Sequence, residues 1–128
     1  MLLLVQTSPG EFLDKVTILE IKSERMSDAK KVANVRHELG LLKDTWQASD
    51  YSRTDISAEW ARLKHINEQL WVIEDDIRDK ERARQFDARF IELARAVYVT
   101  NDERAAVKRL INERLGSKIV EEKSYQAY

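Results

Sequence analysis

The scarcity of turn-forming residues is the strongest constraint on this chain. Its 128 residues include only three glycines and one proline. Because glycine and proline are the residues that most often interrupt regular structure, few sharp turns are available. Long helices must therefore dominate, and the sequence predicts an all-α fold. The length suits one domain with its own hydrophobic core, so we expect residues 1–128 to form a single helical domain.

Composition excludes several classes of function. The 22 basic and 23 acidic side chains give a net charge of −1, whereas a general nucleic-acid binder normally has a basic excess. The absence of cysteine excludes disulfides, thiolate metal sites and a cysteine nucleophile. Hydrophobic residues make up 43% of the chain, which is far above the level typical of disorder. We expect a folded protein with no nucleic-acid partner.

No segment has the character of a membrane span or a signal peptide. The opening "MLLLVQ" is apolar, but it lacks a basic region and is shorter than a signal-peptide core. No apolar run approaches the roughly 18 residues that a membrane-spanning helix needs. We therefore expect a soluble, cytoplasmic protein without membrane insertion.

The first helix has a clear start. Residues 1–6 are predicted to be a short extended segment, and "SPGE" then combines Ser8 as N-cap, Pro9 in the first turn and Glu11 as the partner in a capping box. The helix is predicted to run from Pro9 to Met26. It is apolar on two sides, which is typical of a helix at the centre of a bundle or a dimer.

Two stripes of apolar residues predict a helical hairpin. Ser27 or Asp28 can cap a second helix that runs to about Gln47, and a third helix starts near Ser57. Both helices carry apolar residues at alternating spacings of three and four: Val32, Val35, Leu39, Leu42 and Trp46, then Leu63, Ile66, Leu70, Ile73 and Ile77. This pattern favours an antiparallel, coiled-coil-like hairpin over residues 28–80.

The chain after residue 57 has two interpretations. Residues 57–99 contain no glycine or proline, so they could form one helix, but the apolar face switches sides across residues 79–85. We favour a bend there, with Asp87 helping to cap the next helix. Residues 100–103, "TNDE", form a second capping box, which predicts a last helix that ends before Gly116. The expected architecture is a bundle of about five helices.

Polar residues in apolar positions define the first candidate site. Asn67, Glu74 and Arg78 lie within the apolar arc of the third helix. The first helix can supply facing polar groups from Asp14, Lys15 or Lys22. Such a cluster can fix the register of packed helices, which is the commoner role. The alternative is a polar ligand pocket between the helices.

Two further candidate sites depend on weaker patterns. Four residues surround the expected start of the last helix, where a helix N-terminus attracts anions: Arg95, Tyr98, Asn101 and Arg104. These arginines could equally only link helices to one another. Asp75 and Asp79 lie one helical turn apart and could contribute to an Mg²⁺ site, although a solvated acidic face explains them better. No phosphate loop, nucleotide fingerprint or serine elbow is present.

Several segments resemble a small family of uncharacterised bacterial all-helical proteins. The segments are "SPGEFLDKVTILEIKSER", "LWVIEDDIRDKE", "FIELARAVYVTNDERAAVKRLIN" and "SKIVEEKSY", and the resemblance covers essentially the whole chain. Members are often encoded among genes for lipopolysaccharide and other surface glycans. The resemblance implies a role in that pathway by association and assigns no activity to any residue.

Three function hypotheses follow. The leading one is a non-enzymatic accessory or binding protein of surface-glycan assembly, without a cofactor, whose partner is a glycosyltransferase-type enzyme or a second copy in a homodimer. The alternative is a helical, Mg²⁺-dependent hydrolase or transferase that acts on a nucleotide or sugar nucleotide; a small helical mutase ranks last. An enzyme requires charged groups that converge on an open pocket, whereas an accessory protein is expected to have paired charges and an exposed apolar patch.

Overall fold

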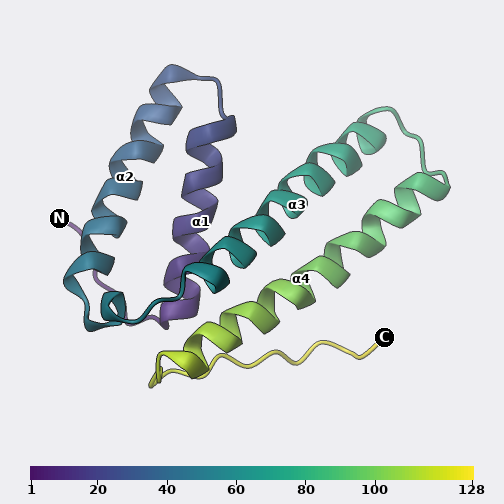
Figure 1. Ribbon diagram of the computed structural model, residues 1–128. Helices are drawn as coiled ribbons and strands as arrows, with labels where there is room; N and C mark the ends of the chain where they lie inside the picture. Colours follow the sequence, from purple (N-terminus) through teal and green to yellow (C-terminus); the bar gives the residue numbers. More distant parts are fainter.

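The computed structural model describes residues 1–128 and is entirely helical, with no strand. It contains α1 (Pro9–Arg25), α2 (Ala29–Ala48), α3 (Ser57–Arg82) and α4 (Ala88–Arg114), with a short 3₁₀-helix, η1 (Asp50–Arg53), between α2 and α3. The helices form two hairpins, α1–α2 and α3–α4, which meet near the start of α1 (Figure 1). The all-α prediction is confirmed, with four α-helices where about five were expected. None of them combines the length and apolar character that crossing a membrane requires.

Side-chain caps start three of the helices where the sequence predicts. The Ser8 hydroxyl accepts a hydrogen bond of 3.1 Å from the backbone N–H of Glu11 at the start of α1. Asp28 caps α2 by accepting hydrogen bonds from the backbone N–H groups of Lys30 and Lys31. Asp87 caps α4 by accepting a hydrogen bond of 3.0 Å from the N–H of Phe90. These caps satisfy N–H groups that have no partner inside the helix.

The predicted hairpin of residues 28–80 does not form, because α2 and α3 do not pack along each other. α2 lies against α1, whereas α3 pairs with α4, and α1 also contacts both α3 and α4. The central position of α1 agrees with its two apolar sides. An apolar stripe shows that a helix has a partner, but it does not identify that partner. In the structure the apolar stripe of α2 faces α1, whereas that of α3 faces α4 and α1.

Residues 57–99 form two helices, as the change of apolar face indicates. The turn after α3 is closed by hydrogen bonds from the N–H groups of Arg84 and Gln85, of 3.0 Å each, to carbonyls in the last turn of α3. Arg84 adopts a left-handed φ of 53°, a conformation more often taken by glycine. Gly116 ends α4 in the same way, with a φ of 65°.

The predicted helix start at residues 100–103 is wrong. α4 runs without interruption from Ala88 to Arg114, so these residues lie in its interior. Thr100 is 8% exposed and faces the core. The capping-box pattern does not start a helix here, because nothing before it interrupts α4. Polar residues are tolerated within a helix when their side chains point to solvent or bond to a carbonyl of the preceding turn.

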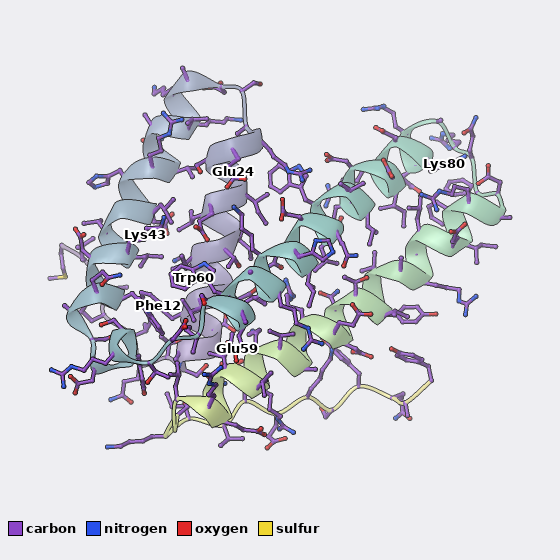
Figure 2. The ribbon with its side chains drawn as sticks, viewed as in Figure 1. Phe12, Glu24, Lys43, Glu59, Trp60 and Lys80 are labelled. Atoms are coloured by element: carbon purple, nitrogen blue, oxygen red, sulfur yellow. The ribbon has the colours of Figure 1, made fainter.

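The hydrophobic core lies where the two hairpins meet. It consists of Leu13, Trp46, Ile56, Leu63, Ile66, Leu70, Val107 and Ile111. The Trp46 ring stacks on Phe12 at 6.1 Å between centroids and meets the edge of Trp60 at 6.0 Å. Phe12 and Trp60, both labelled in Figure 2, thus pack against the same Trp46 ring. Residues from all four α-helices therefore contribute to one core.

Gly10 allows α1 to approach α4 closely. A Cβ atom at this position would lie 2.5 Å from the carbonyl oxygen of Lys108 and 2.8 Å from Oδ1 of Asn112. The first of these atoms belongs to the backbone of a long helix and cannot move without shifting α4. The glycine is thus required by the space between the two helices.

Gly10→Ala is expected to lower the free energy of unfolding by about 1–3 kcal/mol, because the added methyl group forces the helices apart. Gly40→Ala is the matched control: Gly40 lies within α2, and a Cβ there meets nothing within 4 Å. This control should stabilise the protein by roughly 0.5–1 kcal/mol through helix propensity. Urea unfolding of both variants measures the difference, and equal effects would contradict the close approach of α1 and α4.

Candidate functional site

A buried polar cluster occupies the place where α1 meets α3 and α4. Its buried members are Ser8, Asp14, Thr17, Asn67 and Asn112, each no more than 9% exposed, and Lys108 borders it. Burial of polar groups is costly unless they find partners, so the hydrogen bonds within this cluster determine what it can do.

Asp14 and Asn67 form the centre of the buried polar cluster. The Asn67 amide donates to Oδ1 of Asp14 and to Oγ1 of Thr17, at 2.9 Å in both cases. The Thr17 hydroxyl in turn donates to the backbone carbonyl of Asp14 at 2.8 Å. The sequence leaves Asp14, Lys15 and Lys22 as possible facing groups, and in the structure the one that meets Asn67 is Asp14. Oδ1 of Asp14 and the amide nitrogen of Asn67 therefore have hydrogen-bond partners within the protein.

Lys108 supplies positive charge at the edge of the cluster. Its ammonium lies 3.9 Å from Oδ2 of Asp14, and it also pairs with Glu11 and, at 3.6 Å, with Glu121. Its side chain is only 16% exposed. Three carboxylates thus surround one partly buried cation, which offsets the negative charge of Asp14.

Asn112 connects the cluster to the start of α1. Its Oδ1 accepts a hydrogen bond of 2.7 Å from the backbone N–H of Gly10. Sequence reasoning missed both Asn112 and Lys108, because neither stands out within the stripe of α4. Their importance depends on the approach of α1, which no local pattern encodes.

The other members of the first candidate site lie outside the cluster. Lys15 is 60% exposed and pairs with Glu38 of α2 at 3.1 Å, whereas Lys22 lies in the last turn of α1. Glu74 and Arg78 pair with each other at 3.2 Å on the exposed side of α3, as their spacing predicts. The structure therefore gathers two of the six predicted residues, Asp14 and Asn67.

The second candidate site lacks the helix N-terminus on which its prediction depends. Arg95, Tyr98, Asn101 and Arg104 all lie inside α4, so no helix N-terminus is present to attract an anion. Asn101 and Arg104 nevertheless line a groove, described below, and the Tyr98 ring packs on Tyr128 with 5.1 Å between centroids. Arg95 is exposed on the same helix.

The acidic pairs are not gathered around a cation position. Asp75 is exposed, and Asp79 pairs with Arg82 at 2.6 Å. No group of three or more histidine, cysteine, aspartate or glutamate side chains could hold a metal ion.

The acidic pair of α1 is neutralised by neighbouring helices. Glu20 accepts a hydrogen bond of 2.9 Å from the Trp60 indole and lies 3.5 Å from the ammonium of Lys43. Glu24 pairs with Lys64, and that hydrogen bond raises the pKa of Lys64. Figure 2 labels Glu24 on α1, Lys43 on α2 and Trp60 on α3. Both carboxylates thus link α1 to its neighbours.

An open groove of about 870 Å³ lies between α4 and the segment that follows it. We call residues 117–128 the strap, because they run back alongside α4 (Figure 1). The groove is lined by polar and charged groups of α4, including Asn101, Arg104, Lys108, Arg109 and Asn112, and by Glu121, Glu122 and Lys123 of the strap.

Polar contacts attach the strap to the rest of the protein. Glu121 accepts from the Ser8 hydroxyl and pairs with Lys108, and Glu122 lies 3.1 Å from the Arg109 guanidinium. Lys123 pairs with Asp102, and hydrogen bonds from Lys123 and then Tyr128 lower the pKa of the Asp102 carboxyl. The strap thus places carboxylates against the basic groups of α4.

Almost every buried polar side-chain atom has a partner. The exception is Oε2 of Glu59, a residue at the start of α3 whose other oxygen pairs with Arg114 at the end of α4. Glu59 lies between these two helix ends in Figure 2. Its hydrogen bonds, from its own backbone N–H first and then from Arg114, lower the pKa of the Glu59 carboxyl. This pair closes the α3–α4 hairpin at its base.

These contacts define a small all-helical protein with a largely paired polar interior and an open, charged groove along α4. The chain belongs to the family of unknown function DUF6165, which matches residues 3–128. No curated protein and no solved structure matches the chain. The family assigns no activity, so the function has to be argued from the site.

Proposed function

We propose that this protein is a non-enzymatic accessory protein of lipopolysaccharide or other surface-glycan biosynthesis, which acts by binding. The observation that carries the proposal is the pairing of its interior polar groups. Asp14 and Asn67, the most buried of the predicted site residues, have hydrogen bonds to each other and to Thr17. A general acid or base needs a group within reach of a substrate, whereas Asp14 is 6% exposed and its carboxylate faces Asn67 and Lys108 inside the protein.

The exposed apolar segment before α1 supports a role in binding another protein. Leu2, Leu3, Leu4 and Val5 are each at least 76% exposed. A run of exposed apolar residues marks an interaction surface more often than a free surface. The proposed partner is a glycosyltransferase-type enzyme of the same pathway, and the link to that pathway depends on the family resemblance.

The alternative is a cytoplasmic Mg²⁺-dependent hydrolase or transferase that uses Asp75 and Asp79. It would need acidic groups that converge from facing helices, but Glu20 and Glu24 of α1 are paired with Trp60, Lys43 and Lys64. The accessory role requires no such convergence, and for this reason we favour it.

Deletion of the gene in a bacterium that encodes it is expected to alter the length or amount of surface glycan, measured on gels of extracted lipopolysaccharide. The Asp75→Asn/Asp79→Asn variant should restore the profile as well as the unmodified gene does. The purified protein should release no phosphate from nucleotides or sugar nucleotides with Mg²⁺. Turnover that Asp75→Asn abolishes would establish the enzyme alternative instead.

We also propose that the protein forms a homodimer. The chain exposes 9238 Å², whereas a compact monomer of 15.0 kDa exposes about 7,000 Å². Part of this excess comes from the extended segments at either end of the helices. The whole excess, about 2,200 Å², is larger than the roughly 800 Å² that each partner buries in a standard interface.

Multi-angle light scattering at micromolar concentration is expected to give a mass of two chains. Leu3→Asp and Leu110→Asp place a charge at two separate exposed apolar positions, so the variant that dissociates the dimer locates its interface. A single-chain mass for the unmodified protein at about 100 μM would contradict the proposal, because even a dimer with a micromolar dissociation constant assembles at that concentration.

A further inference from the structure

The groove between α4 and the strap has features of a ligand site that the buried polar cluster lacks. It is open, and its volume of about 870 Å³ is within the range of small-molecule sites. One wall is a regular helix, which holds its side chains at fixed positions. The other wall is the strap, which has no regular secondary structure.

The α4 wall presents three cations to the groove. Arg104 is half-buried and has no carboxylate within 4.0 Å. Lys108 and Arg109 both pair with carboxylates of the strap, at 3.6 Å to Glu121 and 3.1 Å to Glu122. Glu113 is the acidic residue of α4 that lines the same groove, so this wall carries a net positive charge.

Asn112 adds a hydrogen-bond donor to the same wall. It is 9% exposed, and its Oδ1 accepts from the Gly10 N–H, which fixes the orientation of the amide. Its Nδ2 has no hydrogen-bond partner in the protein, and the residue lines the groove. This amide nitrogen is accessible from the groove and can donate to an acceptor from outside the chain.

The strap is held in a way that permits displacement. Its large apolar residues remain exposed: Val120 is 68% exposed, Tyr125 84% and Tyr128 79%. Apart from the Tyr128 ring, which packs on Tyr98, attachment depends on ion pairs and hydrogen bonds. The pairs of Glu122 and Lys123 join exposed groups, so they are individually weak and are screened by salt. A ligand that offers the same negative charges can replace the strap carboxylates.

We propose that the groove is a binding site for a phosphorylated small molecule, whose phosphoryl group replaces Glu121 and Glu122 against Lys108, Arg109 and Arg104. Two carboxylates occupy the cationic positions when the site is empty, so the replacing group should carry at least two negative charges. A pyrophosphate or phosphate monoester meets this requirement, and arginine is suited to bind its oxygens. This site goes beyond the proposed accessory role and does not depend on it.

Glu121 and Glu122 should act as competitors of the ligand. Glu11 and Asp14 also face Lys108, so Lys108 remains partly neutralised after the strap leaves. Arg104 and Arg109 should consequently contribute most to binding. The site is expected to be weak in the unmodified protein and stronger when the strap carboxylates are neutralised.

Isothermal titration of the full chain with inorganic pyrophosphate, at low ionic strength and without Mg²⁺, tests the site. Glu121→Gln/Glu122→Gln should lower the dissociation constant about tenfold, because two competing surface ion pairs are removed. Glu92→Gln/Glu103→Gln is the matched control: it changes the net charge equally on exposed positions of α4 outside the groove. The control should change the constant by less than about twofold at these screened distances.

Arg104→Gln/Arg109→Gln should abolish the binding. Asp102→Asn tests the displacement of the strap in another way, because it removes the partner of Lys123 without changing the groove wall. This variant should also lower the dissociation constant. Circular dichroism checks that each variant folds. Equal tightening in the control pair, retention of binding by the double arginine variant, or no binding by any variant would overturn the proposal. Because the assay records binding heat alone, its result is independent of whether the protein has catalytic activity.

Discussion

The hydrogen bond between Asp14 and Asn67 is the interaction on which the rest of the structure depends. It joins the central helix α1 to α3 in the interior, where Asp14 is 6% and Asn67 5% exposed. A buried carboxylate is stable only when its partners are fixed, so this contact restricts how α1 can cross the α3–α4 hairpin. Lys108 adds the contact to α4, and Gly10 allows α4 to come close enough for it. The apolar core then fills the space that these polar contacts leave.

This arrangement separates the polar groups that hold the fold from those that face solvent. Most donors and acceptors of the buried polar cluster are paired within the protein, and Glu20 and Glu24 of α1 pair with α2 and α3. What remains accessible is the charged groove along α4 and the apolar segment before α1. A protein organised in this way is suited to bind partners or ligands at its surface. Its interior is suited to fix how α1 crosses the α3–α4 hairpin.

The sequence predicts the local features of the fold well and the helix partners poorly. Ser8, Asp28 and Asp87 could be identified as caps because capping depends on residues within one turn. The pairing of α2 with α1 could not be identified, since the stripes of α2 and α3 are equally suited to meet each other. The false start at residues 100–103 has the same origin: a capping pattern is necessary for many helix starts but does not by itself interrupt a helix.

The candidate site was predictable only in part, for a related reason. Asp14 and Asn67 could be found because each is polar within an apolar stripe of its own helix. Lys108 and Asn112 could not, because their role arises from the approach of α1 to α4 at Gly10. The sequence places the groove residues Asn101 and Arg104 at a helix N-terminus that the structure does not contain. They line the groove because the strap returns along α4.

A double-mutant cycle on Asp14 and Asn67 tests most directly whether their contact holds α1 in place. The free energy of unfolding in urea would be measured for Asp14→Ala, Asn67→Ala, the double variant and the unmodified protein. If the contact fixes the crossing of α1 and α3, the two substitutions should be coupled by at least about 1 kcal/mol, within the range seen for residues in contact. Additive effects, with coupling within about 0.3 kcal/mol of zero, would contradict this account.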